Sequence, residues 1–589
     1  MNKNELITKV REQDSLTLEE KSQLIDLINR KRYGLVWEDK PEDVEGILNE
    51  NLPVLSEVTD KAIIYNPEKQ NNKTLFENSK DEIPNHILIE GDNLYALTSL
   101  CFTHENKIDV IYIDPPYNTG NKDFKYNDSF VDKEDSYRHS KWISFITKRL
   151  KIAKKLLKDD GVFFTSIGDD EFAQLKILCD EIFGENNFLA NIVRKSKETS
   201  NKGRYFSPST DYVLTYTKNI SQLSEFFDTE AQQKEKYIKL FKNEDERGKY
   251  NIVSLYMPSL DQRPNQRYFI KCPDGTKVIT PTPDKMFRWI PTTFEKNLKD
   301  NRVVFLETKT SPLIDEKGKQ AKWNIYTKIY LHERQDVGTK PLTFVDIPNS
   351  LGSKELIRMN LDFSFSKPKE LIKYLISILN KSNDIIILDF FAGSGTTLQA
   401  TMELNEKDEG TRQCILVTNN ENKICEEITY VRNKKVIKGY TKPNGEKVEG
   451  LTKNNFRYYK TTLVGREKTL KNKRQVTELA TDLLCVKENC YKEIKGAKQI
   501  RIFQENFISI VIIYEDVVIP NAIELIKKLP KENIIKVYVF SEGQDPYTED
   551  FEEVLDRVQL CALPDAIYKA YQNILPKKRK VETEIEAVN

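Results

Sequence analysis

The sequence lacks a hydrophobic run long enough to cross a membrane, and it lacks a surplus of either charge. No stretch approaches the roughly 18 consecutive apolar residues of a transmembrane helix, and the opening residues, MNKNELITKVREQD, contain no signal-peptide core. Lysine plus arginine and aspartate plus glutamate number 91 each, so the formal net charge is zero. We therefore expect a cytoplasmic protein without membrane contact, in which any nucleic-acid surface is a local basic patch.

Cysteine pairs and histidine clusters are also missing. The eight cysteines are scattered, none of them forms a Cys-x-x-Cys pair, and the four histidines do not cluster. A zinc site is therefore not expected, and no metal ion is assigned to the chain. Most of the cysteines lie in apolar stretches, which predicts reduced thiols in a protein core. The chain also has no G-x-x-x-x-G-K-[ST] motif, which argues against NTP hydrolysis.

What the sequence does contain is an alternation of apolar strands and helices. Residues 1–80 have helical, polar character, with a capped helix predicted over 15–34. From residue 85, apolar strands such as IDVIYI and GVFFTSI alternate with helical spacing. This pattern predicts an α/β fold with a mostly parallel sheet covered by helices on both faces.

A chain of 589 residues is too long for one core, and the α/β pattern is interrupted. Residues 196–350 hold many prolines and polar turns, which predicts an irregular, β-rich insert. The alternation resumes at 351, and a smaller α/β unit begins at about 500. The predicted sheet is therefore interrupted by an insertion and completed after it.

The segment DFFAGSGTT begins with Asp389 at the end of a predicted strand. Gly393 and Gly395 would form a tight turn in which backbone N–H groups approach a ligand, and Thr396 is a plausible cap for the next helix. A helix start behind such a turn favours an anionic group, such as a carboxylate or a phosphate. Turns of this kind also serve plain packing, and that alternative stays open for the segment taken alone.

A second segment, DPPYNTG, follows the predicted strand that ends at residue 113. Two prolines make the loop rigid at the carboxyl end of the strand, where open α/β sheets bind ligands. Asp114 and a proline carbonyl offer two acceptors, and Tyr117 offers a flat face. These groups suit an exocyclic amino group on a planar base. A strand-ending turn with a core tyrosine is the alternative for the segment by itself.

Taken together, DPPYNTG and DFFAGSGTT resemble the amino-methyltransferases of DNA, which use S-adenosylmethionine. The order GDN, DPPY, long insert, FSKP and FAGSGT resembles the β class of adenine-N6 methyltransferases, in which a target-recognition insert separates the catalytic and cofactor motifs. The resemblance covers about residues 85–200 and 350–425. It implies a Rossmann-like methyltransferase core and a double-stranded DNA substrate. The absence of a Pro-Cys dipeptide argues against a cytosine-C5 mechanism.

The resemblance implies roles for named residues. Asp114 and the Pro115 carbonyl would accept hydrogen bonds from N6 of a flipped-out adenine, and Tyr117 would stack on the base. The expected catalytic residues are Asp114, Pro115, Pro116 and Tyr117. The expected cofactor-binding residues are Asp92 and Asn93 near the adenine end, Ser366, Lys367 and Pro368 beside the pocket, Asp389, Phe391, Gly393, Gly395, Thr396 and Thr397 at the methionyl end, and Glu421.

The sequence departs from the family after the strand CILV, where an acid that holds the ribose hydroxyls usually follows at once. Here Thr418, Asn419 and Asn420 precede Glu421, so either Glu421 reaches back or amides hold the ribose. An Asp before PPY resembles the adenine-N6 enzymes, whereas a Ser resembles the cytosine-N4 enzymes. Adenine is therefore expected, with cytosine-N4 as the alternative.

Two regions are expected to contact DNA. The insert 196–350 carries arginines beside aromatic residues in NQRYF, KMFRW and RGKYN, which suits base-edge and stacking contacts; an ordinary β-domain surface is the alternative. Residues 431–475 hold fourteen Lys or Arg against three Glu, which favours phosphate contacts over a plain solvated face. The aromatic residues interleaved with these charges are Tyr440, Phe456, Tyr458 and Tyr459.

The long insert and the C-terminal extension resemble the modification subunit of a type III restriction–modification system. Dimers are common in this class, and cleavage would belong to a separate helicase–nuclease subunit. The alternatives are a stand-alone (orphan or type II) methyltransferase with an epigenetic role, a catalytically inactive DNA-recognition subunit and, more distantly, an enzyme acting on RNA.

The expected domains are an N-terminal helical region (1–80), the catalytic half of the core (81–195), the recognition insert (196–350), the cofactor half (351–430), a basic DNA-contacting linker (431–499) and a small α/β domain (500–589).

Overall fold

A computed structural model of the chain describes residues 40–66, 83–198, 205–228, 235–258, 263–335, 339–505, 507–572 and 574, together with 9, 10, 12, 13, 16, 17, 20 and 21. The helix predicted at 15–34 lies largely outside these residues. Within them, no helix is both long and apolar enough to span a membrane. All eight cysteines are free thiols, and seven of them are buried.

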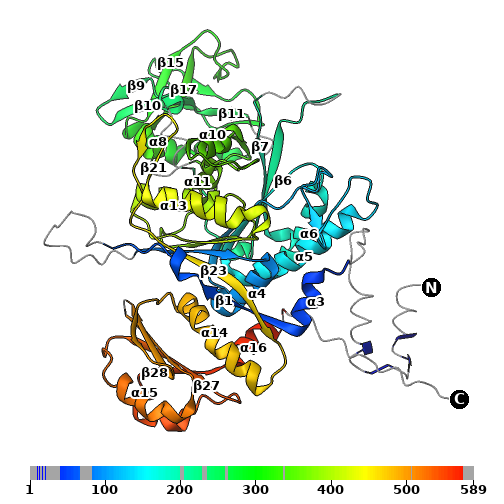
Figure 1. Ribbon diagram of the computed structural model, residues 1–589. Coiled ribbons are helices and arrows are strands. Elements are labelled where there is room, and N and C mark those ends of the chain that lie inside the picture. Colours follow the sequence, from blue (N-terminus) through cyan, green and yellow to red (C-terminus); the bar gives the residue numbers. More distant parts are fainter. Residues whose placement is uncertain are drawn as a thin grey trace.

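A ten-stranded sheet forms the centre of the molecule (Figure 1). Its strands, in spatial order, are β1 (Asn51–Glu57), β23 (Asn455–Gly465), β2 (Asn85–Glu90), β20 (Gln413–Thr418), β19 (Ile386–Asp389), β3 (Ile108–Ile113), β6 (Leu157–Ile167), β8 (Thr210–Thr217), β7 (Phe188–Lys195) and β18 (Phe344–Asp346). The six strands from β23 to β6 run parallel, while β1 and β8 run antiparallel to their neighbours. The predicted α/β fold with a mostly parallel sheet is confirmed.

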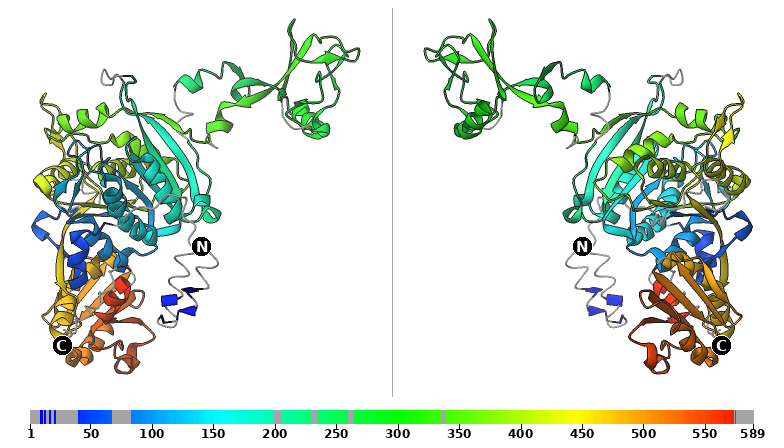
Figure 2. Two further views of the ribbon diagram at one scale, coloured as in Figure 1. Left: turned by 90° about the vertical axis from the view of Figure 1, so that its right-hand side faces the viewer. Right: turned by 90° about the vertical axis from the view of Figure 1, so that its left-hand side faces the viewer.

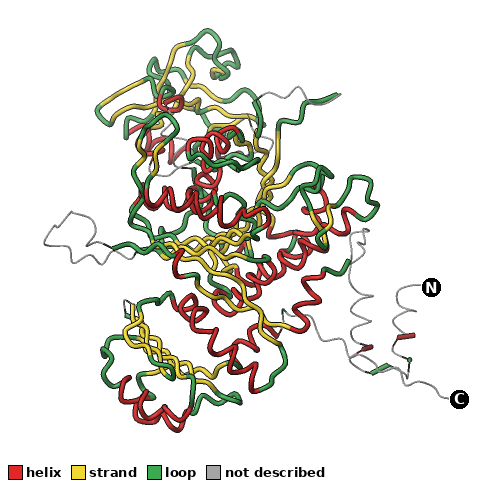
Figure 3. The backbone as a smooth tube through the Cα atoms, in the orientation of Figure 1, coloured by secondary structure: helices red, strands yellow, loops and turns green. Residues whose placement is uncertain are grey.

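Helices cover both faces of this sheet (Figure 3). In β2, Ile87 and Ile89 are fully buried on one face and Leu88 is fully buried on the other, so the strand has no solvent side. The first face packs against α4 (Asn93–His104), α5 (Arg138–Leu156), α6 (Phe172–Phe183) and α14 (Leu470–Glu488), and the second against α11 (Lys369–Ser377), α12 (Thr396–Asp408) and α13 (Tyr430–Lys438).

Two sheet strands come from regions where none was predicted. β1 lies in the region predicted to be helical, and that prediction is wrong here because Leu52, Val54 and Leu55 are buried against the core. β23 lies in the region predicted to be a basic linker. For these residues a linker is wrong, because β23 pairs with β1 on one side and β2 on the other, while the DNA contact expected of the stretch stays a prediction. The aromatic side chains expected among its charges, Phe456, Tyr458 and Tyr459, are fully buried, and Tyr440 is half-buried.

Most of the residues between β8 and β18, from α7 (Glu235–Ile238) to α9 (Leu331–Gln335), form a lobe that projects away from the central sheet (Figure 2). It has its own small core, which includes Leu255, Phe287 and Ile325. The predicted insert is corrected at its ends, because β8 and β18 pair into the central sheet. The elements of the lobe are α7 (Glu235–Ile238), β9 (Asn243–Asp245), β10 (Gly248–Ser254), β11 (Tyr256–Pro258), β12 (Ile270–Lys271), β13 (Lys277–Ile279), β14 (Lys285–Phe287), α8 (Pro291–Lys299), β15 (Val303–Glu307), β16 (Ile314–Asp315), β17 (Trp323–Tyr330) and α9 (Leu331–Gln335).

The C-terminal residues build a five-stranded sheet with β26, β27 and β28 parallel. One face packs under α15, and the other joins the main core through α14 and α16. The Tyr571 hydroxyl donates to the Pro53 carbonyl at 2.9 Å, which ties α16 to β1. The bounds are β24 (Glu493–Gly496), β25 (Ile500–Glu505), β26 (Ile508–Ile513), α15 (Ile519–Ile526), β27 (Ile534–Phe540), β28 (Val558–Leu563) and α16 (Asp565–Gln572); short elements elsewhere are α3 (Asp43–Glu50), β4 (Lys125–Tyr126), β5 (Ser129–Phe130), α10 (Ser350–Arg358), β21 (Tyr440–Thr441) and β22 (Lys447–Val448).

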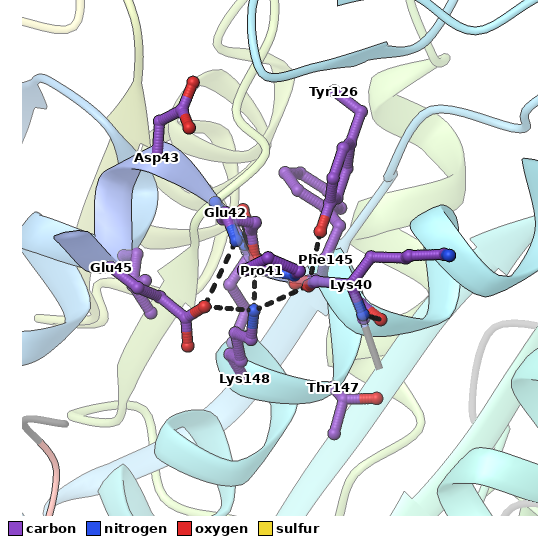
Figure 4. A network of polar contacts seen from close by, with 12 residues as sticks. Lys40, Pro41, Glu42, Asp43, Glu45, Tyr126, Phe145, Thr147 and Lys148 are labelled. Atoms are coloured by element: carbon purple, nitrogen blue, oxygen red, sulfur yellow. Dashed lines mark hydrogen bonds and ion pairs between the residues drawn. The ribbon is translucent and has the colours of Figure 1, made fainter. Parts of the chain in front are cut away.

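A polar network fastens the start of α3 to α5 (Figure 4). Lys148 Nζ lies 2.6 Å from Glu45 and 3.3 Å from Glu42. The Tyr126 hydroxyl donates to the Lys40 carbonyl at 2.6 Å. This network places the Glu42 carboxylate against α5, next to the residues that support the candidate site.

Candidate functional site

The carboxyl ends of β3 and β19 meet at one edge of the sheet. The two strands are parallel neighbours, with Val110 opposite Ile387 and Ile111 opposite Leu388. The DPPY loop continues β3, and the FAGSGT turn continues β19. Because open parallel sheets bind ligands at this edge, the two predicted motifs lie where a shared site can form.

The Asp114 carboxylate is paired with Lys367. Lys367 Nζ lies 2.7 Å from each carboxylate oxygen and donates to the Tyr117 hydroxyl at 2.9 Å. The same ammonium lies 4.9 Å from the centre of the Tyr117 ring. Lys367, expected beside the cofactor, therefore has its charged end in the DPPY loop.

Close packing fixes the aromatic ring and the prolines of this loop. A Cβ atom on Gly168 would come within 2.8 Å of the Tyr117 ring, so the ring lies against bare backbone just after β6. Trp142 Nε1, from α5, donates to the Pro116 carbonyl at 2.8 Å. Burial, followed by the nearby Asp114 charge, raises the pKa of Tyr117 well above its usual value, so the hydroxyl stays neutral.

A buried carboxyl group supports the residue after the tyrosine. Asn118 has a left-handed backbone (φ 56°), and its Nδ2 donates to Glu171 Oε1 at 2.5 Å and to the Arg138 carbonyl at 3.2 Å. His139 Nδ1 lies 2.7 Å from the same Glu171 oxygen. Burial raises the pKa of Glu171 to about 8. The sequence gives no signal for this group, because its partners come from other segments.

Asp389 is buried at the end of β19. Its carboxylate accepts a hydrogen bond of 2.6 Å from the Thr397 hydroxyl and one of 3.0 Å from the Phe391 N–H. Burial raises the pKa of Asp389 to about 7, although both hydrogen bonds act in the opposite direction. Gly393 and Gly395 have left-handed backbones, with φ of 49° and 78°. The predicted glycine turn thus lies beside an acid that is only partly ionised at neutral pH.

The guanidinium of Arg432 organises the start of α12. This fully buried side chain donates to Thr396 Oγ1 at 2.7 Å, to Ser394 Oγ at 2.8 Å and to Ser366 Oγ at 3.3 Å. Burial lowers its pKa to about 10. Thr396 was expected to cap α12, but Gly395 occupies the cap position and the threonine hydroxyl is turned to Arg432. In the sequence Arg432 counted only as one charge of a basic run.

Asp92 and Asn93 form the start of α4, close to the same turn. Asp92 caps the helix, and Asn93 Nδ2 donates to the Phe390 carbonyl at 3.3 Å. Arg149, fully buried on α5, donates to the Asn93 side-chain oxygen and lies 3.0 Å from Glu42. The structure therefore brings both predicted residues to the β19 turn, with Arg149 as an unpredicted support.

Pro368 lies beside the pocket, whereas Glu421 lies on the surface. Pro368 precedes α11 directly and occupies its N-cap position, so it follows Lys367 at the pocket. Glu421 opens a short 3-10 turn after β20 and pairs with Lys125 at 2.8 Å, with 47% of its side chain exposed. The structure thus shows Glu421 in a surface ion pair with the β4–β5 hairpin.

Comparison with known proteins places these motifs in a family. The family model described as DNA methylase matches residues 108–435. The type III restriction-modification enzyme StyLTI Mod subunit of Salmonella typhimurium is 33% identical over 379 residues, covering 60% of this chain and 54% of that protein. The EcoPI Mod subunit of Escherichia phage P1 is 30% identical over 444 residues, covering 67% and 64%. This chain thus spans about half to two thirds of the length of these relatives.

Other similar proteins include a type II enzyme and two solved structures. The type II methyltransferase M.KpnI of Klebsiella pneumoniae is 32% identical over 349 residues, covering 56% of this chain and 79% of that protein. The structure of PvuII DNA methyltransferase (cytosine-N4-specific) is 13% identical with a TM-score of 0.31, covering 62% and 96%. The structure of a DNA modification methylase from Thermus thermophilus, complexed with S-adenosyl-L-methionine, is 13% identical with a TM-score of 0.28, covering 59% and 92%.

Proposed function

This chain belongs to the DNA methylase family, and on that premise we propose that it transfers a methyl group from S-adenosylmethionine to N6 of an adenine flipped out of double-stranded DNA. The observation that carries the proposal is the meeting of the DPPY loop and the FAGSGT turn at neighbouring strand ends. One loop offers acceptors and an aromatic face for a base. The other offers a glycine turn beside a buried acid.

The DPPY loop is the part that would hold the base. Asp114 and the Pro115 carbonyl accept hydrogen bonds from the two N6 protons, and Tyr117 stacks on the ring. The Asp114 side chain is 24% exposed, so one side of it is open to a ligand. Base flipping costs a few kcal/mol, roughly, which stacking and edge contacts offset. The reaction depends on orientation more than on acid–base power, because the methyl donor is already activated.

The β19 turn is the part that would hold the cofactor. A Cβ atom on Gly393 would make only ordinary contacts, at 3.9 Å from Phe363 Cζ and from the Phe391 carbonyl oxygen, so an opening lies beside the turn. This opening fits the methionyl group of S-adenosylmethionine, which supplies an electrophilic methyl when it is bound. The residues that we assign to the cofactor are Asp389, Phe391, Gly393, Gly395, Thr396 and Thr397 at the methionyl end, Ser366 and Pro368 beside it, and Asp92 and Asn93 near its adenine; Glu421 remains a candidate for the ribose.

We assign adenine as the target base because Asp, and not Ser, precedes PPY at Asp114. Cytosine-N4 is the alternative, since a cytosine also presents an exocyclic amine beside a ring nitrogen. Intact Asp114, Tyr117 and glycine turn disfavour an inactive recognition subunit.

We further propose that the chain acts as the modification subunit of a type III restriction–modification system, with double-stranded DNA and a separate restriction subunit as partners. The similarity to the StyLTI and EcoPI Mod subunits supports this assignment. We expect a homodimer acting in the cytoplasm. A stand-alone methyltransferase is the second candidate, because the similarity to M.KpnI covers 79% of that type II enzyme.

We assign sequence recognition to the projecting lobe and phosphate contacts to exposed cations of the basic stretch. Lys434 and Lys438 on α13 and Lys447 in β22 are exposed. They follow the cofactor half of the core in the chain, whereas Arg432 and Arg457 of the same stretch are engaged inside the protein. Phosphate contacts of this kind position DNA without reading its sequence.

Single-molecule long-read sequencing of DNA from a methylation-free host tests the proposal. The host expresses this chain alone or its Asp114→Ala variant. We expect N6-methyladenine at one short motif with the wild type and none with the variant, while the purified variant still binds S-adenosylmethionine. Methylation of one strand only favours the type III assignment. Unchanged methylation by the variant would falsify the role of Asp114.

A further inference from the structure

The ion pair at the tip of β3 places a donor directly beside the acceptor that is assigned to the target amine. The Lys367 ammonium makes three hydrogen bonds to the DPPY loop: to the two Asp114 oxygens at 2.7 Å and to the Tyr117 hydroxyl at 2.9 Å. Only 11% of the Lys367 side chain is exposed. Lys367 comes from the segment before α11, so two distant parts of the chain build this donor–acceptor pair.

The pair would be a purely structural salt bridge only if Asp114 and Lys367 used all of their hydrogen-bonding capacity on each other. An ionised carboxylate has about four lone-pair sites, so Asp114 can accept from an incoming amine while it keeps Lys367. The ammonium has three donors, and the one that reaches the Tyr117 hydroxyl contacts a neutral group that water or a ligand can replace. Both partners can therefore take a further ligand without breaking the pair.

We propose that Lys367 donates a hydrogen bond to the ring nitrogen N1 that adjoins the target amine of adenine. The Watson–Crick edge of adenine presents an amine donor next to a ring-nitrogen acceptor. Asp114 and Lys367 present the complementary acceptor and donor at neighbouring positions. Guanine and thymine present a carbonyl oxygen where adenine has its amine, and that oxygen would face the Asp114 carboxylate. The pair thus reads the amine and its neighbouring nitrogen together.

This hydrogen bond also directs the chemistry to the amine. The N1 lone pair lies in the ring plane and is free to react, whereas the N6 lone pair is delocalised into the ring. A bond from Lys367 occupies the N1 lone pair and leaves N6 as the available nucleophile. In the transfer, the N6 electron pair would form the new bond to the methyl carbon, the methyl–sulfur bond would break with its electron pair left on sulfur, and the N6 proton would pass to the Asp114 carboxylate that accepts its hydrogen bond. The inference rests on the proposed adenine-N6 activity and names a residue that reads its substrate.

The test combines one substitution in the protein with one replacement of the target base, so that four pairs of protein and duplex are compared. Wild type and Lys367→Met are compared on duplexes that carry the motif found by sequencing, with adenine or 1-deazaadenine at the target position. We expect 1-deazaadenine to lower kcat/KM of the wild type about 10- to 100-fold, the range for a hydrogen bond from a charged donor. We expect Lys367→Met to methylate adenine slowly. Replacing adenine by 1-deazaadenine should then lower the kcat/KM of this variant by less than about threefold.

Two controls separate this contact from general damage. Lys373→Met, on the outer part of α11, should behave as the wild type on both duplexes, because its ammonium pairs with Glu403 outside the pocket. A 7-deazaadenine duplex should be methylated by the wild type at nearly the adenine rate, since it keeps N1. This comparison needs no variant, so it holds even if Lys367→Met does not fold.

Two results would overturn the N1 contact. In one, 1-deazaadenine lowers kcat/KM by the same factor for the wild type and for Lys367→Met. In the other, 1-deazaadenine does not lower kcat/KM of the wild type. Failure of the proposed function looks different. In that case the wild type modifies no adenine in any duplex, and the inference falls with its premise.

Discussion

Asn118, the first residue after the DPPY motif, donates a hydrogen bond to Glu171 Oε1 at 2.5 Å. The Glu171 side chain has no exposed surface. His139 Nδ1 lies 2.7 Å from the same oxygen, and burial lowers the pKa of His139. The turn that follows Tyr117 therefore rests on an acid that is mostly protonated at neutral pH, since burial raises its pKa to about 8.

This buried acid makes folding stability depend on pH. The folded pKa of Glu171 is raised from 4.5 to about 8, so the folded state holds its proton over a pH range in which the unfolded state has released it. Stability is then fully present below about pH 4.5 and is lost as the pH rises through 8, by at most about 1.4 kcal/mol per pH unit. Glu171→Gln removes this titration and keeps an acceptor for Asn118.

Urea unfolding of the wild type and Glu171→Gln between pH 5 and 9 measures the effect. We expect the free energy of unfolding of the wild type to fall relative to that of the variant as the pH increases. Parallel curves for the two proteins would show that Glu171 ionises in the folded state at its ordinary pKa.

A second prediction concerns the hydrogen bond from Thr397 to Asp389. Thr397→Val keeps the shape of the side chain but removes the donor, leaving a buried carboxylate with the Phe391 N–H as its remaining donor. We expect a loss of about 1–3 kcal/mol in the free energy of unfolding, the cost of an unsatisfied buried polar group. We also expect weaker binding of S-adenosylmethionine by calorimetry. Thr401→Val is the matched control on the same helix, because its hydroxyl donates to the Thr397 carbonyl and not to a buried carboxylate.

The two central motifs could be predicted from the sequence because both are local. A run of buried strand residues, followed by two prolines or by two glycines, fixes the loop conformation over a few positions. The family similarity that these motifs predicted is confirmed by the comparisons. The parallel sheet could also be predicted, because near-continuous apolar strands such as β3 carry no solvent side.

The supporting residues could not be predicted, because their partners lie far away in the sequence. Lys367 meets Asp114 across 253 residues, and Arg149 meets Glu42 across 107. β1 pairs with β23 across a still longer range of the chain, from Asn51 opposite Gly465 to Glu57 opposite Tyr459, and a short strand gives no sign of a distant partner. A charge count cannot separate the buried Arg432 from the exposed Lys434 of the same run.

The third prediction tests this buried arginine. Arg432→Met has similar volume but removes the donors to Ser394, Thr396 and Ser366. We expect a loss of about 2–4 kcal/mol in the free energy of unfolding and weaker cofactor binding, since the start of α12 loses its support. Arg432→Lys should recover only part of both, because an ammonium cannot reproduce the planar guanidinium geometry.

Arg474→Met, at an exposed position of α14, is the control for Arg432. Its change in stability should stay within about 0.5 kcal/mol. Urea unfolding and calorimetric titration with S-adenosylmethionine provide the two readouts. A stability of Arg432→Met equal to that of the wild type would mean that the hydroxyl cluster needs no guanidinium.

The last prediction concerns the contact between Gly168 and the Tyr117 ring. Gly168→Ala would place a Cβ atom 2.8 Å from Cδ2 of that ring, and the ring has to move because backbone lies behind the new methyl group. Overpacking of this kind costs about 1–3 kcal/mol in stability. We expect methylation to fall at least about tenfold, because small misplacements at a reacting group have large effects on rate. Cofactor affinity should change little, since the β19 turn is untouched.

Gly46→Ala in α3, where no atom lies within 4 Å of the added methyl, should leave methylation unchanged and stabilise the helix by about 0.5–1 kcal/mol. Wild-type methylation by Gly168→Ala would mean that the position of the Tyr117 ring does not limit the reaction.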